Sequence, residues 1–166
     1  MPRTPRTKKR HPLRKKDAGG YLDILAGLYG PDELEMIDPR GMEYLETDMF
    51  VLILHAGIPV LVIRDGIAFP ALRHILERPP SSAWVSVDMG AVPHVINGAD
   101  VMAPGVRDAH PGIMVDSVVW IRDLQHSKPL AVGLALMDAA AMISSEKGKA
   151  VKTLHFVGDP VWEHRP

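Results

Sequence analysis

The sequence predicts an α+β fold in which a small α/β unit is followed by a partly closed barrel of short mixed strands with two short helices. Short apolar runs bounded by glycine, proline and aspartate recur along the chain, a pattern typical of such barrels. A Pro-Pro-Ser-Ser segment at 79–82 separates two groups of these runs. We therefore expect a flexible basic arm at 1–12, a first domain at 13–80 and a second domain at 83–166.

The first domain is expected to begin with a helix and continue with short strands. Apolar side chains recur at helical spacing over 21–28, so we place a helix at 13–28, although two consecutive glycines weaken it. An Asp-Gly pair at 65–66 lies between two apolar runs and indicates a hairpin turn. Strands are predicted at 34–37, 50–54 and 59–63, followed by a helix that opens at Pro70.

The second domain is expected to alternate short strands with two helices. Asp138 suits the N-cap position of a helix at 139–143. The tryptophans are expected to pack inside the barrel, because large aromatic side chains dominate small cores; they are Trp84, Trp120 and Trp162. Strands are predicted at 84–87, 115–121, 130–136, 153–157 and 161–162.

Residues 87–105 have the most informative local pattern in the chain. Asp88 can cap a short helix, and Pro93 fits the first turn of that helix, where a missing N–H costs little. Gly98 suits a left-handed position just after the helix ends. An apolar pair then restarts the chain as a strand, and Pro104-Gly105 ends that strand in a turn. The segment is therefore predicted to be a strand end, a capped helix, a glycine stop, a strand and a turn.

The net charge of −1 conceals a strong asymmetry along the chain. The first 16 residues contain eight basic side chains and no acidic one, whereas the other 150 residues have a formal charge of −9. A dense basic segment on an acidic body indicates a polyanionic partner, and we favour nucleic acid over a purely solubilising terminus. The basic residues are Arg3, Arg6, Lys8, Lys9, Arg10, Arg14, Lys15 and Lys16.

Several function classes are not expected from this composition. The chain has no cysteine, so it cannot form disulfides, thiolate zinc sites or a cysteine nucleophile. The eight histidines show no metal-ligand spacing, and no phosphate-binding glycine loop is present. No apolar run approaches the ~18 residues of a membrane span, and the start lacks the apolar region of a signal peptide. We expect a cytoplasmic protein without catalytic apparatus, cofactor or metal.

The ordered pattern at 87–105 resembles the opening of a PUA domain, a small RNA-binding barrel. Residues 69–79 look like the segment that joins the pre-PUA and PUA domains in the malignant T-cell-amplified-sequence family of translation proteins. The basic stretch at 9–16 is similar to the start of archaeal-type members, and residues 158–162 look like the final strand of the family. The resemblance covers about residues 9–163 and implies a pre-PUA domain at 13–80 followed by a PUA-type pseudo-barrel at 83–166.

The resemblance also implies a function. Eukaryotic relatives are not enzymes; they bind the small ribosomal subunit and the acceptor end of tRNA, together with a partner that carries an initiation-factor-one-like domain. For this chain the resemblance implies a non-enzymatic factor of translation initiation or recycling that binds structured RNA. We expect a monomer, because no long amphipathic seam is present. Two alternatives stay open: an accessory subunit that presents RNA to a modifying enzyme, and a protein-interaction adaptor.

Carried over to this sequence, the RNA-binding surface comprises the segment after the first helix of the second domain and two nearby cations. Small residues there let a ribose or phosphate approach the backbone closely. Where eukaryotic relatives have a lysine after a Gly-Ala pair, this chain reads Gly90-Ala91-Val92-Pro93-His94, so no lysine contact is expected from that helix. The predicted residues are Asn97, Gly98, Ala99, Asp100, Val101, Met102, Pro104, Gly105, Arg107 and Lys128, with Lys9, Arg10, Arg14, Lys15 and Lys16 from the basic segment.

Overall fold

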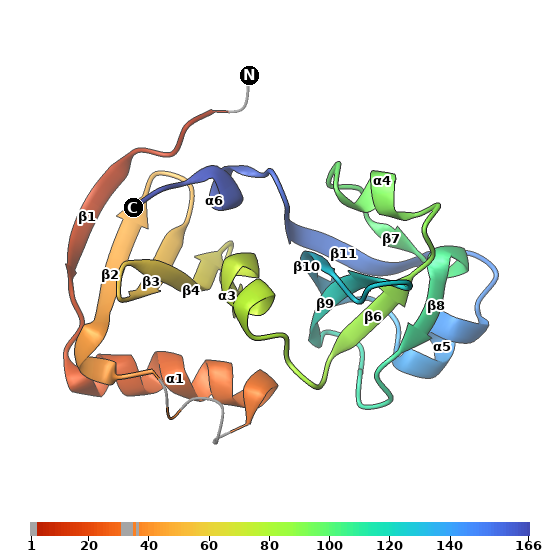
Figure 1. The fold of residues 1–166 in the computed structure, drawn as a ribbon, viewed down its shortest axis with the longest axis horizontal. Helices are drawn as coiled ribbons and strands as arrows, with labels where there is room; N and C mark the ends of the chain where they lie inside the picture. Colours follow the sequence, from red (N-terminus) through yellow and green to blue (C-terminus); the bar gives the residue numbers. More distant parts are fainter. Residues whose placement is uncertain (1–2, 31–34, 36) are drawn as a thin grey trace.

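The computed structural model describes residues 3–30, 35 and 37–166, and it contains two sheets that lie side by side (Figure 1). The first sheet is wholly antiparallel with the order β1-β2-β3-β4-β5. The first unit consists of β1 Thr7–Pro12, α1 Lys15–Tyr29, β2 Met42–Thr47, β3 Val51–His55, β4 Ile58–Arg64, β5 Ile67–Pro70 and α3 Leu72–Glu77.

The second sheet has six strands in the order β7-β11-β10-β9-β6-β8, and it curls into a partly closed barrel. Its β6 and β9 run parallel, whereas its other neighbours are antiparallel. The predicted α+β architecture with a pseudo-barrel is confirmed. The second unit consists of β6 Trp84–Val87, α4 Val92–Val95, β7 Val101–Met102, β8 Val106–Ala109, β9 Val118–Asp123, β10 Pro129–Ala135, α5 Ala139–Ser144, β11 Lys149–Phe156 and α6 Pro160–Glu163.

Local chemistry explains where several elements begin and end. Asp65 and Gly66 have φ values of 52° and 76°, so they form the tight turn that joins β4 to β5 as predicted. Asp138 accepts a hydrogen bond from Ala141 N at 2.8 Å and caps α5, also as predicted. Pro70 ends β5, and α3 begins two residues later than expected, at Leu72.

The prediction of a flexible arm at 1–12 is wrong for the strand β1, which pairs with β2 along the edge of the first sheet. Acidic groups on and beside β2 hold the segment in place. Arg10 forms a two-pronged contact with Glu43, and Arg6 N donates to Asp48 Oδ1 at 2.8 Å. These contacts lie more than thirty residues apart in sequence, so the basic composition alone did not indicate them.

Two further predictions differ from the structure. Residues 161–162 belong to the short helix α6 instead of a final strand, because Asp159 accepts from Trp162 N at 2.8 Å and caps a helical turn that opens at Pro160. The strand predicted at 115–121 begins only at Val118, since Asp116 has a left-handed φ of 70°. Of the strand expected at 34–37, residues 34 and 36 lie outside the described residues, and residues 35 and 37 are not in a strand.

The two units share a hydrophobic core in addition to their own cores. Trp120 is 1% exposed and packs between the sheets with residues of both units, so it does not fill the barrel interior as expected. Its Nε1 donates to Ser82 O at 2.9 Å, which fixes the connecting segment. Across the same interface, Leu72 N donates to Nε2 of the buried His155 at 3.1 Å. No helix in the described ranges combines the length and apolar character needed to cross a membrane.

Candidate nucleic-acid interface

A hollow of about 400 Å³ lies beside α4, and we call it the α4 groove. Its walls are mostly small or apolar side chains from α4, the loop that follows it, β7 and the start of β11. Five of the predicted RNA-binding residues line it, and four other residues complete it. The lining residues are Ala99, Asp100, Val101, Met102 and Gly105 from the prediction, with Ala91, His94, Val95 and Lys149.

Three local features build the groove from its sequence. Asp88 Oδ1 accepts from Ala91 N at 2.8 Å and closes the turn that leads into α4. Gly98 has a φ of 88°, and a Cβ there would lie 2.7 Å from the ring of Phe156 on β11. Any side chain at Gly98 would therefore be strained twice, by its backbone conformation and by the ring. The glycine stop predicted from sequence is confirmed, and it lets the loop pass close to β11.

Asp100 stabilises the groove by joining the loop after α4 to β11. Its carboxylate accepts from Thr153 N at 3.0 Å and pairs with Lys149 Nζ at 3.0 Å. Burial alone would raise the pKa of Asp100, but the hydrogen bond from Thr153 and the charge of Lys149 outweigh burial and lower that pKa. Asp100 thus links the loop after α4 to β11, and its negative charge faces a lysine instead of a bound anion.

The remaining predicted residues of the second unit lie around the groove. Val101 is 2% exposed, so it can offer a ligand little beyond its backbone. Arg107 is on the rim, where Nη2 pairs with Asp88 Oδ2 at 2.8 Å and Nη1 donates to Pro104 O. Asn97 and Pro104 are exposed next to the lining residues, and Lys128 is exposed in the turn between β9 and β10.

The basic residues of the first unit form a separate surface, which we call the basic edge: Lys8 and Lys9 on β1, Arg14, and Lys15 and Lys16 in the first turn of α1. All five are exposed, and none has an ion-pair partner within residues 3–30, 35 and 37–166. Arg10 differs from them, because it is paired with Glu43. Figure 1 places β1 and α4 at opposite ends of the molecule, so the structure does not bring the two predicted sets together.

Sequence reasoning missed two polar residues of the groove. They are His94 on α4 and Lys149 at the start of β11. Lys149 joins the groove because β7 and β11 pair in a register that places Lys149 opposite Met102. No pattern in the sequence reports that long-range register. Among the described residues, no group of three or more His, Asp or Glu side chains is arranged to hold a metal ion.

Comparison with known proteins shows which family of domains the second unit belongs to. Residues 83–157 match the family described as PUA domain. A conserved PUA domain protein from Thermoplasma acidophilum superimposes with a TM-score of 0.77 at 27% identity, over 95% of this chain and 100% of that one. A hypothetical protein from Pyrococcus horikoshii OT3 superimposes with a TM-score of 0.84 at 34% identity, over the same shares of the two chains. The second unit is therefore a PUA domain, and its α4 groove lies within the matched residues.

Relatives in sequence identify the family of the whole chain. An uncharacterized protein of Methanocaldococcus jannaschii is 40% identical over 95% of this chain and 98% of that protein. The translation machinery-associated protein 20 of Eremothecium gossypii is 32% identical over 70% of this chain and 72% of that protein. A Drosophila melanogaster homolog of malignant T-cell-amplified sequence 1 is 34% identical over 62% and 58%. The chain belongs to this family of translation-associated PUA proteins, as its motifs indicated.

Proposed function

We propose that this chain is a non-enzymatic RNA-binding factor of translation that acts on the small ribosomal subunit and on tRNA ends. The α4 groove carries the proposal, because it is a hollow with small and apolar walls, a lysine at its edge and a PUA framework around it. Small residues such as Ala99 and Gly105 leave room for a ribose or phosphate beside the backbone. An exposed Met102 offers an apolar surface to a base.

The basic edge supports the same proposal from a different property. Lys15 and Lys16 occupy the first turn of α1, where the positive end of the helix dipole disfavours cations. Arg14 precedes them and provides no side-chain cap. Five exposed cations that have no acidic partner among the described residues are well suited to a phosphate backbone. We assign them the salt-dependent part of RNA affinity.

Cosedimentation of the purified protein with ribosomal subunits tests this function. Small subunits, large subunits and free tRNA should be compared at low and at moderate salt. We expect saturable binding that prefers small subunits, survives moderate salt and is reduced by competing tRNA. Binding that is equal for small subunits, large subunits and tRNA and that disappears at moderate salt would contradict the proposal. It would show only non-specific attraction of RNA by the basic edge.

A further inference from the structure

The most exposed large apolar side chains of the described residues lie far from the α4 groove. Met114 and Val115 are 69% and 56% exposed, in the loop at 110–117 that joins β8 to β9. In Figure 1 this loop is on the lower side of the molecule between α1 and α5, whereas α4 is on the upper side. Neither the fold nor the proposed RNA-binding function accounts for this exposure.

Hydrogen bonds and packing hold this loop in place. Asp116 N donates to Ala135 O at 2.8 Å, and Ala139 N donates to Ile113 O at 3.1 Å. The Ile113 side chain is 3% exposed and belongs to the core of the second unit. The exposed apolar pair is therefore presented by a loop that is fixed on both sides. Where such side chains belong to a larger contiguous apolar surface, that surface is typical of an interaction site.

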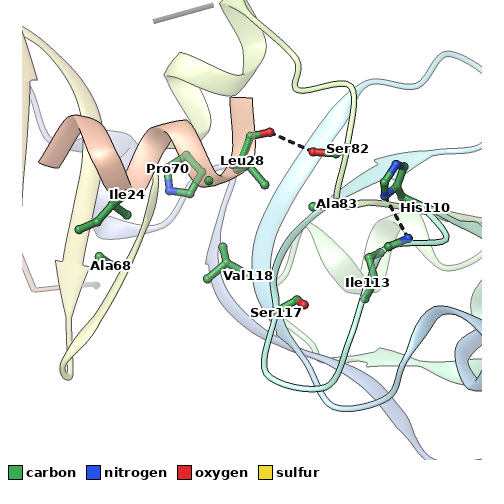
Figure 2. Close-up of a pocket in the computed structure, with 12 residues that line it drawn as sticks. Ile24, Leu28, Ala68, Pro70, Ser82, Ala83, His110, Ile113, Ser117 and Val118 are labelled. Atoms are coloured by element: carbon green, nitrogen blue, oxygen red, sulfur yellow. Dashed lines mark hydrogen bonds between the residues drawn. The ribbon is translucent and has the colours of Figure 1, made fainter. Parts of the chain in front are cut away.

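Two hollows flank the loop and extend the apolar surface. One, of about 410 Å³, lies between the two units, and Figure 2 shows Ile24 and Leu28 of α1 on one side of it and Ile113 and Ser117 on the other. The second, of about 430 Å³, lies between the loop and the start of α5. Ile113 lines both hollows, so they adjoin across the loop. We call this surface the loop face; it comprises Ile24, Leu28, Pro111, Ile113, Met114, Val115 and Ala140.

The three segments that supply the residues of the loop face carry acidic side chains but no lysine or arginine. The stretches 17–29, 110–121 and 129–146, which contribute α1, the loop and α5, contain no lysine or arginine. The acidic residues in them that adjoin the face are exposed, namely Asp23 beside Ile24, Asp116 beside Val115, and Asp138 in the second hollow. An acidic rim repels phosphate and attracts cations. The occupant that fits is thus apolar at its centre and basic at its edges.

We propose that the loop face docks a segment of a partner protein whose apolar side chains are flanked by lysine or arginine. Its apolar side chains enter the two hollows and cover Met114 and Val115, while its basic side chains meet Asp116 and Asp138. Burial of the apolar centre supplies most of the affinity, and the acidic rim supplies orientation and a faster association rate. The proposal does not rest on RNA binding, so each can fail without the other.

Two double variants separate the apolar centre from the acidic rim. Met114→Ser with Val115→Ser removes exposed apolar surface without touching the core. Asp116→Asn with Asp138→Asn removes two charges and keeps the shape, because asparagine tolerates a left-handed φ and also caps helices. Leu124→Ser is the matched control, since Leu124 is 48% exposed at the opposite end of β9.

Selection of short random peptides displayed on phage against the full chain tests the proposal, with titration of the labelled winning peptides onto each variant. We expect the selected peptides to combine apolar residues with flanking lysine or arginine. Their affinity should fall at least about tenfold in the serine variant and about threefold in the asparagine variant, with a weaker salt dependence. Leu124→Ser should bind them like the unmodified chain.

Four outcomes overturn the proposal. The first is that no peptide binds the unmodified chain better than the serine variant. The second is that the winning peptides lack basic residues. The third is a dimer in solution that the serine variant dissolves, because a second copy would then occupy the face. The fourth is a loss of RNA affinity in the serine variant, which would make the face part of the RNA interface.

Discussion

The α4 groove and the basic edge carry the two sets of predicted RNA-binding residues, and they are built in opposite ways. The groove depends on close packing: Gly98 lies against Phe156, and Asp100 is bonded to β11. It contains a single lysine, which is already paired. The basic edge depends on charge: its five cations are exposed on β1 and α1 and contact no acidic group among the described residues.

This difference predicts that the two regions contribute to RNA binding in different ways. A shaped hollow with few free charges can select an RNA feature by fit, and it should depend little on salt. Exposed lysines on an edge strand attract any phosphate backbone, and their contribution should fall as salt rises. Substitutions in the two regions should therefore separate stability, selectivity and salt dependence.

Gly98→Val should have the largest effect of any single change in the groove. The new side chain would combine a strained backbone at φ 88° with a collision against Phe156, so we expect the free energy of unfolding to fall by about 2–4 kcal/mol. Chemical denaturation measures this loss. Gly57→Val provides a matched control, because Gly57 has a similar φ of 80° but nothing within 4 Å of its Cβ position. Equal losses at both sites would show that packing against Phe156 is not required.

Asp100→Ala should lower the free energy of unfolding by about 1–2 kcal/mol, because it leaves Thr153 N without its partner. The same change releases Lys149 from its ion pair, so RNA affinity should stay equal or rise in the folded fraction. Asp100→Asn should restore most of the stability. A fall in RNA affinity without a change in stability would instead assign Asp100 to direct RNA contact.

Replacing Lys8, Lys9, Lys15 and Lys16 with glutamine should change salt dependence and leave the fold intact. If about half of these side chains meet phosphates, the slope of log affinity against log salt should become shallower by about 2. Substitution is the suitable test, because deleting residues 1–16 would remove the strand β1 from its sheet. As single changes, Lys9→Gln should matter more than Arg10→Gln, since Arg10 is already paired with Glu43.

Acid should loosen β1 from its sheet. The hydrogen bond from Arg6 N and the charge of Arg3 lower the pKa of Asp48, and the hydrogen bond from Arg10 lowers that of Glu43. Depressed pKa values stabilise the folded state above the ordinary values of about 4, and this stabilisation is lost as the pH falls below them. The protection of the amides along 7–12 against hydrogen exchange, corrected for the intrinsic exchange rate at each pH, should fall first in that range. Unchanged protection between neutral pH and pH ~3 would contradict this role of the two carboxylates.

Sequence reasoning predicted the elements whose causes are local. The segment at 87–105 has the predicted order of elements, because Asp88 and Gly98 act on residues within a few positions of themselves. The predicted cap is wrong: Asp88 closes the turn before α4, whose N-cap is Ala91 with no side-chain hydrogen bond. The prediction failed where the cause is distant. Pairing of β1 depends on Glu43 and Asp48, and the position of Lys149 depends on the register between β7 and β11. The helix α6 is an exception, because the strand predicted there was wrong although the cause of the helix, the cap from Asp159, is local.

The central claim is that the α4 groove holds RNA, and two methionines test it most directly. Met102 lies in the groove and is 46% exposed, whereas Met114 lies on the loop face and is 69% exposed. The measurement is the affinity of Met102→Glu and Met114→Glu for small ribosomal subunits at moderate salt. We predict a loss of about tenfold or more for Met102→Glu, because the new charge would face phosphates, and a change within about twofold for Met114→Glu. Equal affinities for the two variants would contradict the claim.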